Sequence, residues 1–231
     1  MKKEINDLYN YGYKIVQNGE YFKFSLDSIL LADFIKINPT DKKLLDLCTG
    51  NAPIPIILSE KVSDIVGIEI QPEIYTLAVE SVKENKIGNI KIINDNVKNY
   101  NNHFEDGIFD IVSCNPPYFK YKKDSIINKN MIKSIARHEI EITLEEIIDI
   151  AYKALKTRGR FYLVHHSERF IEIINLLQKR NFGIKTLEFA YNDYDSDCSV
   201  VLIEAMKNGK NYCKIAQPLI TKNYRGDIEW K

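Results

Sequence analysis

Short apolar runs alternate with longer amphipathic segments along most of this 231-residue chain. The apolar runs have the length and composition of buried strands and cover residues 44–48, 64–70, 89–94, 109–114 and 160–166. The segments between them carry apolar residues at helical spacing, as in PEIYTLAVESVKENK and ERFIEIINLLQKR. This alternation predicts an α/β fold, in which helices cover both faces of a parallel sheet.

The pattern changes after residue 182. Two apolar runs, 184–191 and 198–207, are joined by the polar loop NDYDSD and predict an antiparallel pair of strands at one edge of the sheet. A helix is expected over 27–37, and residues 208–231 form a tail with room for one more strand. Residues 119–140 form a long connection, and long connections in compact domains are usually functional or disordered.

The composition argues against several classes of protein. With 32 basic and 32 acidic residues the net charge is zero, which is not typical of a protein that coats nucleic acid by charge alone. No run of about 18 apolar residues indicates a membrane span, and the start of the chain does not resemble a signal peptide. The cysteines are far apart and favour a reduced, cytoplasmic protein with free thiols: Cys48, Cys114, Cys198 and Cys213.

Polar or conformationally special residues follow four consecutive expected strands. They are the loop 49–52, Glu69, the pair Asp95 and Asn96, and the tetrad 115–118. Ligands of open parallel sheets bind beyond the carboxyl ends of the strands. We therefore expect these four groups to surround one ligand.

Three of these groups suggest a ligand that contains a nucleoside. Gly50 would let the backbone approach a ligand closely, although a plain tight turn explains the loop equally well. Glu69 follows Asp46 by 23 residues, near the spacing at which an acidic residue meets ribose hydroxyls. Asp95 could accept a hydrogen bond from an adenine amino group, and a simple turn residue is nearly as good an explanation. A dinucleotide and S-adenosylmethionine both satisfy these features.

The tetrad Asn115, Pro116, Pro117, Tyr118 favours methyl transfer to an amine. The exocyclic amine of adenine is a weak nucleophile because its lone pair is shared with the ring. Two acceptors on its N–H bonds would orient that lone pair and take up developing positive charge. The Asn115 side chain and the Pro116 carbonyl could be these acceptors, Pro117 would stiffen the turn, and Tyr118 would offer a face for stacking. The alternative is a proline-rich turn without a catalytic role.

The long connection after the tetrad is both basic and aromatic. Such a segment beside an active site suits a flipped base with its phosphates nearby, and a solvated lysine loop is the alternative. The residues expected to contact RNA are Phe119, Lys120, Tyr121, Lys122, Lys123, Lys129, Lys133 and Arg137. The pairs His138–Glu139 and His165–His166 lack metal-ligand spacing, so no metal site is expected.

The segments DLCTGN, GIEI, NDNV and NPPYF resemble, in this order, the motifs of class I S-adenosylmethionine-dependent methyltransferases. Residues 21–36, 135–151 and 159–170 are similar to one branch of that family, the bacterial tRNA(Val) adenine-N6 methyltransferases. The resemblance implies a Rossmann-like fold with a seven-stranded, mostly parallel sheet. Ala52 departs from the family's glycine-rich loop, which leaves the contacts at that position open.

The resemblance also implies contacts for the cofactor S-adenosylmethionine. Its methionine part would lie by Asp46, Gly50 and Asn51, its ribose by Glu69, and its adenine by Asp95, Asn96 and Val97. The other residues expected at the cofactor are Asp27, Cys48, Thr49, Ile70 and Asn115, with Ser28 beside Asp27. Residues 1–40 would cap the cofactor site, residues 41–207 would form the methyltransferase domain, and residues 208–231 would be a tail of the same domain.

The predicted function is N6-methylation of an adenine in RNA, and the resemblance implies the adenine 3′ of the anticodon in a valine tRNA. A glutamine-amide methyltransferase of the release-factor type would use the same acceptors. Such enzymes usually carry a helical domain before the catalytic one, and only about forty residues precede the first strand here. A catalytically silent RNA-binding module is the third hypothesis, although NPPY and Glu69 are both present. The expected partners are tRNA and the methyl donor, and the chain is expected to be a monomer without membrane contact.

Overall fold

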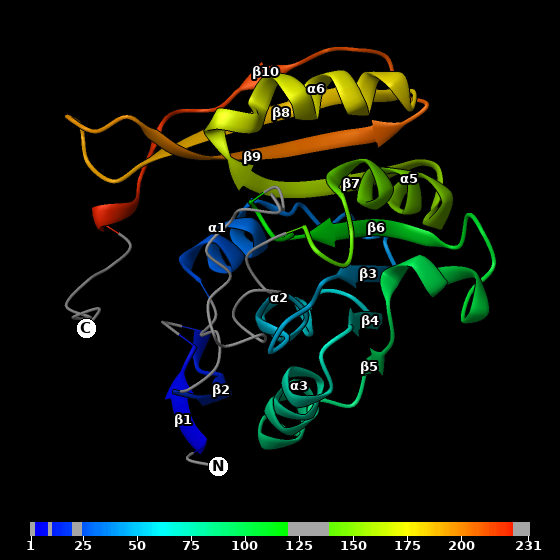
Figure 1. Ribbon diagram of the computed structural model, residues 1–231, viewed down its shortest axis with the longest axis vertical. Coiled ribbons are helices and arrows are strands. Elements are labelled where there is room, and N and C mark those ends of the chain that lie inside the picture. The colour runs from blue at the N-terminus through cyan, green and yellow to red at the C-terminus, as the bar shows by residue number, and fades with distance from the viewer. Residues whose placement is uncertain (1–2, 9–10, 20–24, 120–138, 224–231) are drawn as a thin grey trace.

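The computed structural model describes residues 3–8, 11–19, 25–119 and 139–223. In these ranges the chain forms one sheet of nine strands, helices on both of its faces, and a separate two-stranded hairpin (Figure 1). The expected α/β fold with a mostly parallel sheet is confirmed.

Five strands of the large sheet are parallel and lie in the order β7-β6-β3-β4-β5. They are β3 (Lys43–Leu47), β4 (Asp64–Glu69), β5 (Ile90–Asn94), β6 (Phe109–Cys114) and β7 (Leu155–His166). The chain runs outward from β3 to β5 and then returns to the other side of β3, where Leu47 pairs with Cys114. The carboxyl ends of β3 and β6 therefore form a topological switch point, where ligands bind in sheets of this type.

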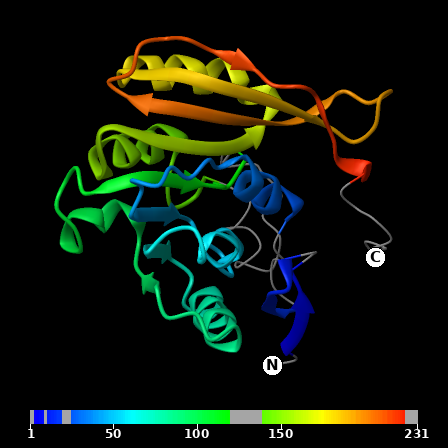
Figure 2. The ribbon, with the colours of Figure 1, turned by 180° about the vertical axis from the view of Figure 1, so that it is seen from behind.

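The other edge of the sheet holds the predicted antiparallel pair. Strand β9 (Cys198–Lys207) lies between β7 and β8 (Phe182–Tyr191) and is antiparallel to both. The expected count of seven strands is wrong, because β10 (Lys214–Ile215) and β11 (Leu219–Ile220) also pair with β8. Each has only two residues and depends on the free edge of β8 for its partners, so no local pattern marks it. Figure 2 shows β10 along this outer edge.

Helices form the two outer layers. They are α1 (Leu26–Phe34), α2 (Pro53–Leu58), α3 (Pro72–Glu84), α5 (Leu144–Ala154) and α6 (Phe170–Lys179), with short 3₁₀ turns η2 (Val97–Asn102), η3 (Ser167–Arg169) and η4 (Thr221–Asn223). Successive strand residues face opposite layers. Leu44 and Ile111 belong to the core that contains α1 and α2, whereas Leu45 and Val112 belong to the core that contains α5 and α6.

The N-terminal hairpin consists of β1 (Lys3–Asp7) and β2 (Lys14–Asn18). It lies against α3, where the Val16 amide donates a hydrogen bond of 2.9 Å to the Ser81 hydroxyl. The polar sequence of this region gave no sign of two strands. None of the helices in the described ranges is long and apolar enough to cross a membrane. The four cysteines carry free thiols, as expected.

Candidate active site

A cavity opens at the switch point and brings the four predicted strand ends together. Its empty space measures about 910 Å³, part of it open to solvent. The sequence-predicted residues in its wall are Asp46, Cys48, Thr49, Gly50, Asn51, Glu69, Ile70, Asn96, Val97, Asn115 and Pro117. Ser28 reaches the wall from α1, so the segment before the first parallel strand contributes to the cavity. We call this space the cofactor cavity.

Several residues of the wall were not assigned to the site from the sequence. Gln71 comes directly after Ile70, and Ile74 lies in the first turn of α3, so their closeness to the end of β4 could have suggested them. Glu141 and Ile142 precede α5 and arrive from the end of the long connection, so no local signal marks them. Ile74 and Ile142 are buried and add apolar surface that suits a planar ring.

The loop after β3 contains backbone that most residues avoid. Cys48, Gly50 and Ala52 have φ angles of 56°, 58° and 66°, all in the left-handed region. Only Gly50 adopts this conformation without cost, so Cys48 and Ala52 hold strained backbone beside the cavity. The Gly50 amide donates a hydrogen bond of 3.0 Å to Glu69 Oε2, which ties the loop to the end of β4.

Glu69 is the acidic group best placed for a ribose. Its side chain is buried in the wall, and its two oxygens accept hydrogen bonds of 3.0 Å from the amides of Gly50 and Gln71. Burial raises the pKa of Glu69, while these backbone hydrogen bonds oppose the rise. Each carboxylate oxygen has a second lone pair that can accept from a diol.

Asp46 lies deeper, at the end of β3. Its oxygens accept hydrogen bonds from the hydroxyls of Thr49 at 2.7 Å and Ser113 at 2.6 Å. Burial raises the pKa of Asp46 to about 7. Gly67 on the neighbouring strand makes room for this arrangement, because a Cβ there would lie 2.8 Å from the Thr49 hydroxyl oxygen. Asp46 thus braces the loop as well as lining the cavity.

Two residues predicted to contact the cofactor use their side chains elsewhere. The Asn51 amide donates a hydrogen bond of 2.7 Å to the Val16 carbonyl, which joins the loop to the hairpin. Asp95 is not part of the cavity wall. Its carboxylate accepts from Asn99 at 2.7 Å and contacts the His103 ring at 2.6 Å, and these two partners lower the pKa of Asp95. The next two residues, Asn96 and Val97, do line the cavity.

The Asn115 amide sits where the tetrad meets α1. Its nitrogen donates to the hydroxyls of Ser28 at 2.9 Å and Ser25 at 3.3 Å. Its oxygen lies 2.7 Å from the Tyr118 hydroxyl, which is also 2.8 Å from the Asp27 carboxylate. Asn115 and Pro117 line the cofactor cavity, and Pro116 lies between them in the chain, whereas Asp27 and Tyr118 are not among the lining residues.

The Tyr118 ring packs against two histidines at the end of β7. Its centroid lies 4.9 Å from that of His165 and 4.4 Å from that of His166. His165 is fully buried, and its two ring nitrogens have no hydrogen-bond partner within the described ranges. Burial and the nearby Arg169 lower the pKa of His165 to about 3, so this ring is neutral. Neither histidine was assigned to the site from the sequence, but in the folded chain both contact the tetrad through Tyr118.

Arg169 holds the two ends of the long connection together. It donates to the Tyr118 carbonyl at 3.3 Å and pairs with Glu139 at 2.5 Å and Glu172 at 2.9 Å. The Glu139 amide donates a hydrogen bond of 2.8 Å to the Phe119 carbonyl. Most of the residues expected to contact RNA lie outside the described residues: Lys120, Tyr121, Lys122, Lys123, Lys129, Lys133 and Arg137. Phe119 is described, and 48% of its surface is exposed.

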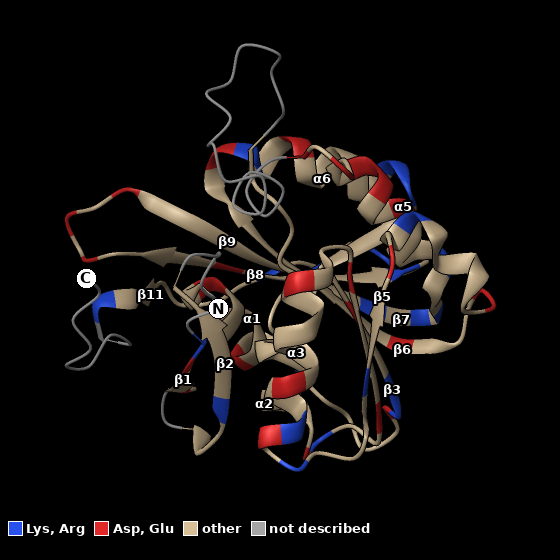
Figure 3. Ribbon diagram, turned by 60° about the horizontal axis from the view of Figure 1, so that its bottom comes forward, with Lys and Arg blue, Asp and Glu red and all other residues tan. Residues whose placement is uncertain are grey.

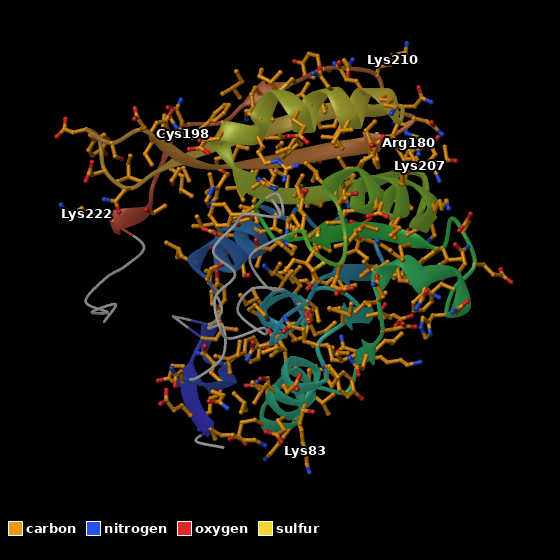
Figure 4. The ribbon with its side chains drawn as sticks, in the orientation of Figure 1. Lys83, Arg180, Cys198, Lys207, Lys210 and Lys222 are labelled. Atoms are coloured by element: carbon orange, nitrogen blue, oxygen red, sulfur yellow. The ribbon has the colours of Figure 1, made fainter. Side chains whose placement is uncertain are left out.

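Charge in the described part of the chain is mixed. Figure 3 shows acidic and basic residues interspersed on α3, α5 and α6. Arg180, Lys207 and Lys210 project from the end of the sheet opposite the cofactor cavity (Figure 4), and Lys207 pairs in register with Phe182 at the start of β8. These cations are therefore remote from the tetrad.

The residues of the cavity fit the cofactor that the sequence suggested. The wall combines a buried carboxylate for a diol, apolar side chains for a ring, and the Gln71 side-chain oxygen, a buried acceptor without a donor among the described residues. S-adenosylmethionine presents ribose hydroxyls, an adenine ring and an ammonium group as matching partners.

Comparisons with known proteins find methyltransferases among the similar sequences and solved structures. One relative is the tRNA1(Val) (adenine(37)-N6)-methyltransferase of Pseudoalteromonas translucida, 26% identical over 75% of this chain and 73% of the relative. Another is the release factor glutamine methyltransferase of Fusobacterium nucleatum, 24% identical over 77% of this chain and 51% of the relative. The solved structure of TYW2 from M. jannaschii in complex with AdoMet has a TM-score of 0.59 and 17% identity, and the match covers 88% of this chain and 85% of that one.

The family comparison covers most of the molecule. The model of the "Methyltransferase domain" family matches residues 39–222, which include all the strands of the large sheet and the whole switch point. The chain therefore belongs to the methyltransferase-domain family and is an S-adenosylmethionine-dependent methyltransferase.

Proposed function

We propose that this methyltransferase modifies the N6 amine of an adenine in tRNA, and that its target is the adenine 3′ of the anticodon in a valine tRNA. The observation that carries the proposal is the Asn115 amide in the wall of the cofactor cavity. A side-chain amide at this place can accept a hydrogen bond from an amine held beside the methyl donor. Relatives named for this reaction support the choice of adenine and of tRNA.

The residues of the chain act mainly by positioning. S-adenosylmethionine supplies an activated methyl group when it is bound. Glu69 would hold the ribose hydroxyls, while Asn96, Val97 and the apolar wall would hold the adenine ring. Asn115 Oδ1 and the Pro116 carbonyl would accept the two N–H bonds of the target amine and stabilise the positive charge that develops on it.

Recognition of the RNA would fall to the segment that begins at Phe119. An exposed aromatic ring directly after the tetrad suits stacking with a base of a single-stranded loop. We propose that the lysines of residues 120–137 contact the neighbouring phosphates. We also propose that residues 1–40 cap the cofactor site, in keeping with Ser28 in the cavity wall and the bond between Asn51 and Val16.

A second candidate is methylation of a glutamine side chain in a protein. It is favoured by the similarity to the release factor glutamine methyltransferase, although this chain spans about half the length of that relative. A glutamine amide also offers a nitrogen with two N–H bonds, so Asn115 and Pro116 could serve either substrate.

The deciding experiment supplies labelled S-adenosylmethionine with total tRNA, duplex DNA or a release factor in parallel. Label in tRNA that is recovered as N6-methyladenosine, at the adenine 3′ of the valine anticodon, is the expected result. Label confined to the release factor would establish the glutamine reaction instead. The Asn115→Ala variant is the background control, because it should remove the label while the purified protein remains folded.

A further inference from the structure

One hydrogen atom at the Tyr118 hydroxyl faces two acceptors. The phenol oxygen lies 2.7 Å from Asn115 Oδ1 and 2.8 Å from Asp27 Oδ2. A phenol carries a single O–H hydrogen, and a carbonyl or ionised carboxylate oxygen can only accept. Asn115 and Asp27 therefore compete for the same hydrogen.

The remaining bonds of the Asn115 amide are already assigned. Its NH₂ group donates to Ser28 and Ser25, so Oδ1 is the atom left to receive the target amine. If Oδ1 also accepts from Tyr118, one of its two lone pairs is occupied and its electron density is drawn away from the amine. An acceptor without this second donor would hold the amine more strongly.

Asp27 is placed to take the hydrogen. It lies in the first turn of α1. Burial raises the pKa of Asp27, while the hydrogen bonds that it accepts from Tyr118 and Ser25 oppose the rise. Hydrogen bonds to an ionised carboxylate are roughly twice as strong as those to a neutral carbonyl. The competition therefore favours Asp27 over Asn115 whenever the carboxylate is ionised.

We infer that Asp27 is a positioning residue, which holds the Tyr118 hydrogen away from Asn115 and so leaves Asn115 Oδ1 open to the target amine. The inference rests on the proposed amine acceptor role of Asn115. It differs from the contact with the cofactor that the family resemblance implied for Asp27, since Asp27 does not line the cavity and Ser28 does.

The inference predicts that a second substitution restores part of the kcat that the first one removes. In Asp27→Ala the freed Tyr118 hydrogen bonds to Asn115, and kcat should fall by roughly three- to tenfold, the effect of one ordinary hydrogen bond. Tyr118→Phe removes the hydrogen but keeps the ring that packs on His165 and His166. The double variant Asp27→Ala/Tyr118→Phe should therefore have a higher kcat than Asp27→Ala alone.

The matched control is Asp33→Ala. Asp33 lies on the same helix and also accepts from a tyrosine hydroxyl, that of Tyr11, but neither residue lines the cofactor cavity. This variant should keep the wild-type kcat. Thermal unfolding of each variant establishes that it is folded, and calorimetry measures its affinity for S-adenosylmethionine.

The assay measures kcat and KM for methyl transfer at saturating cofactor. A double variant no faster than Asp27→Ala would refute the inference while leaving the proposed function intact, because the wild-type protein would still methylate its substrate. Loss of cofactor affinity in Asp27→Ala, with unchanged kcat, would also refute it, because Asp27 would then act on cofactor binding instead. A wild-type protein that labels neither tRNA nor a release factor would overturn the inference and the proposed function together.

Discussion

Glu69→Gln should weaken the binding of S-adenosylmethionine by roughly 10- to 150-fold. In the wild-type protein both Glu69 oxygens accept from backbone amides, at 3.0 Å each, and each has a lone pair left for a ribose hydroxyl. Glutamine keeps one acceptor oxygen and replaces the other with an NH₂ donor, which faces a backbone N–H. The ribose then loses one hydrogen bond to a charged group, and such a bond contributes about 1.5–3 kcal/mol. At 1.4 kcal/mol for each factor of ten, this loss gives the stated range.

Isothermal titration calorimetry of the purified protein tests this value. The matched control is Glu73→Gln, an exposed acidic residue in the first turn of α3 that does not line the cofactor cavity. Glu73→Gln should bind the cofactor as tightly as the wild-type protein, and NAD should bind to none of the three proteins. Wild-type affinity in Glu69→Gln would refute the argument that this carboxylate holds the ribose.

Three further predictions concern catalysis, stability and RNA binding. Asn115→Ala should lower kcat by roughly a hundredfold or more, as for loss of one preorganised polar group, while calorimetry shows nearly unchanged cofactor affinity. Asp46→Asn should raise the free energy of unfolding at pH 8 by about 2–4 kcal/mol. The raised pKa of Asp46 means that the wild-type protein loses stability as pH rises from about 4 to about 7. Thermal melts should show the gain of the variant shrinking towards pH 4, and a difference that is constant with pH would contradict the prediction. Replacing Lys120, Lys122 and Lys123 with alanine should weaken tRNA binding and flatten its dependence on salt without changing cofactor affinity, and an unchanged salt slope would exclude these lysines as phosphate contacts.

The sequence alone was sufficient to predict the parallel strands of the central sheet. Its parallel strands are continuous apolar runs because both of their faces are buried, and such runs are visible without any tertiary information. The residues at their carboxyl ends could be recognised for the same reason, since parallel strands that share one sheet must end at one edge. Asp46, Gly50, Glu69, Asn96 and Asn115 all line the cofactor cavity as this argument predicts.

Strands whose hydrogen bonds come from a distant partner could not be recognised in this way. The two residues of β10 and the two of β11 form strands only because they pair with β8, whose last residue lies more than twenty positions earlier in the sequence. In β1 no residue is fully buried, so the strand lacks the apolar run that would mark it. Pairing with β2 and packing of β2 on α3 decide the hairpin instead.

The partners of individual side chains were decided only by the tertiary structure. The residue types show that Asp95 can accept hydrogen bonds and that the Asn51 amide can donate them. In the folded chain Asp95 contacts His103, and Asn51 donates to the Val16 carbonyl. The tetrad could be recognised as a motif, whereas the bond of Tyr118 to Asp27 spans 91 positions and the bond of Arg169 to its carbonyl spans 51. The type of a residue determines which hydrogen bonds it can make, and only the packing of distant segments determines which of them it does make.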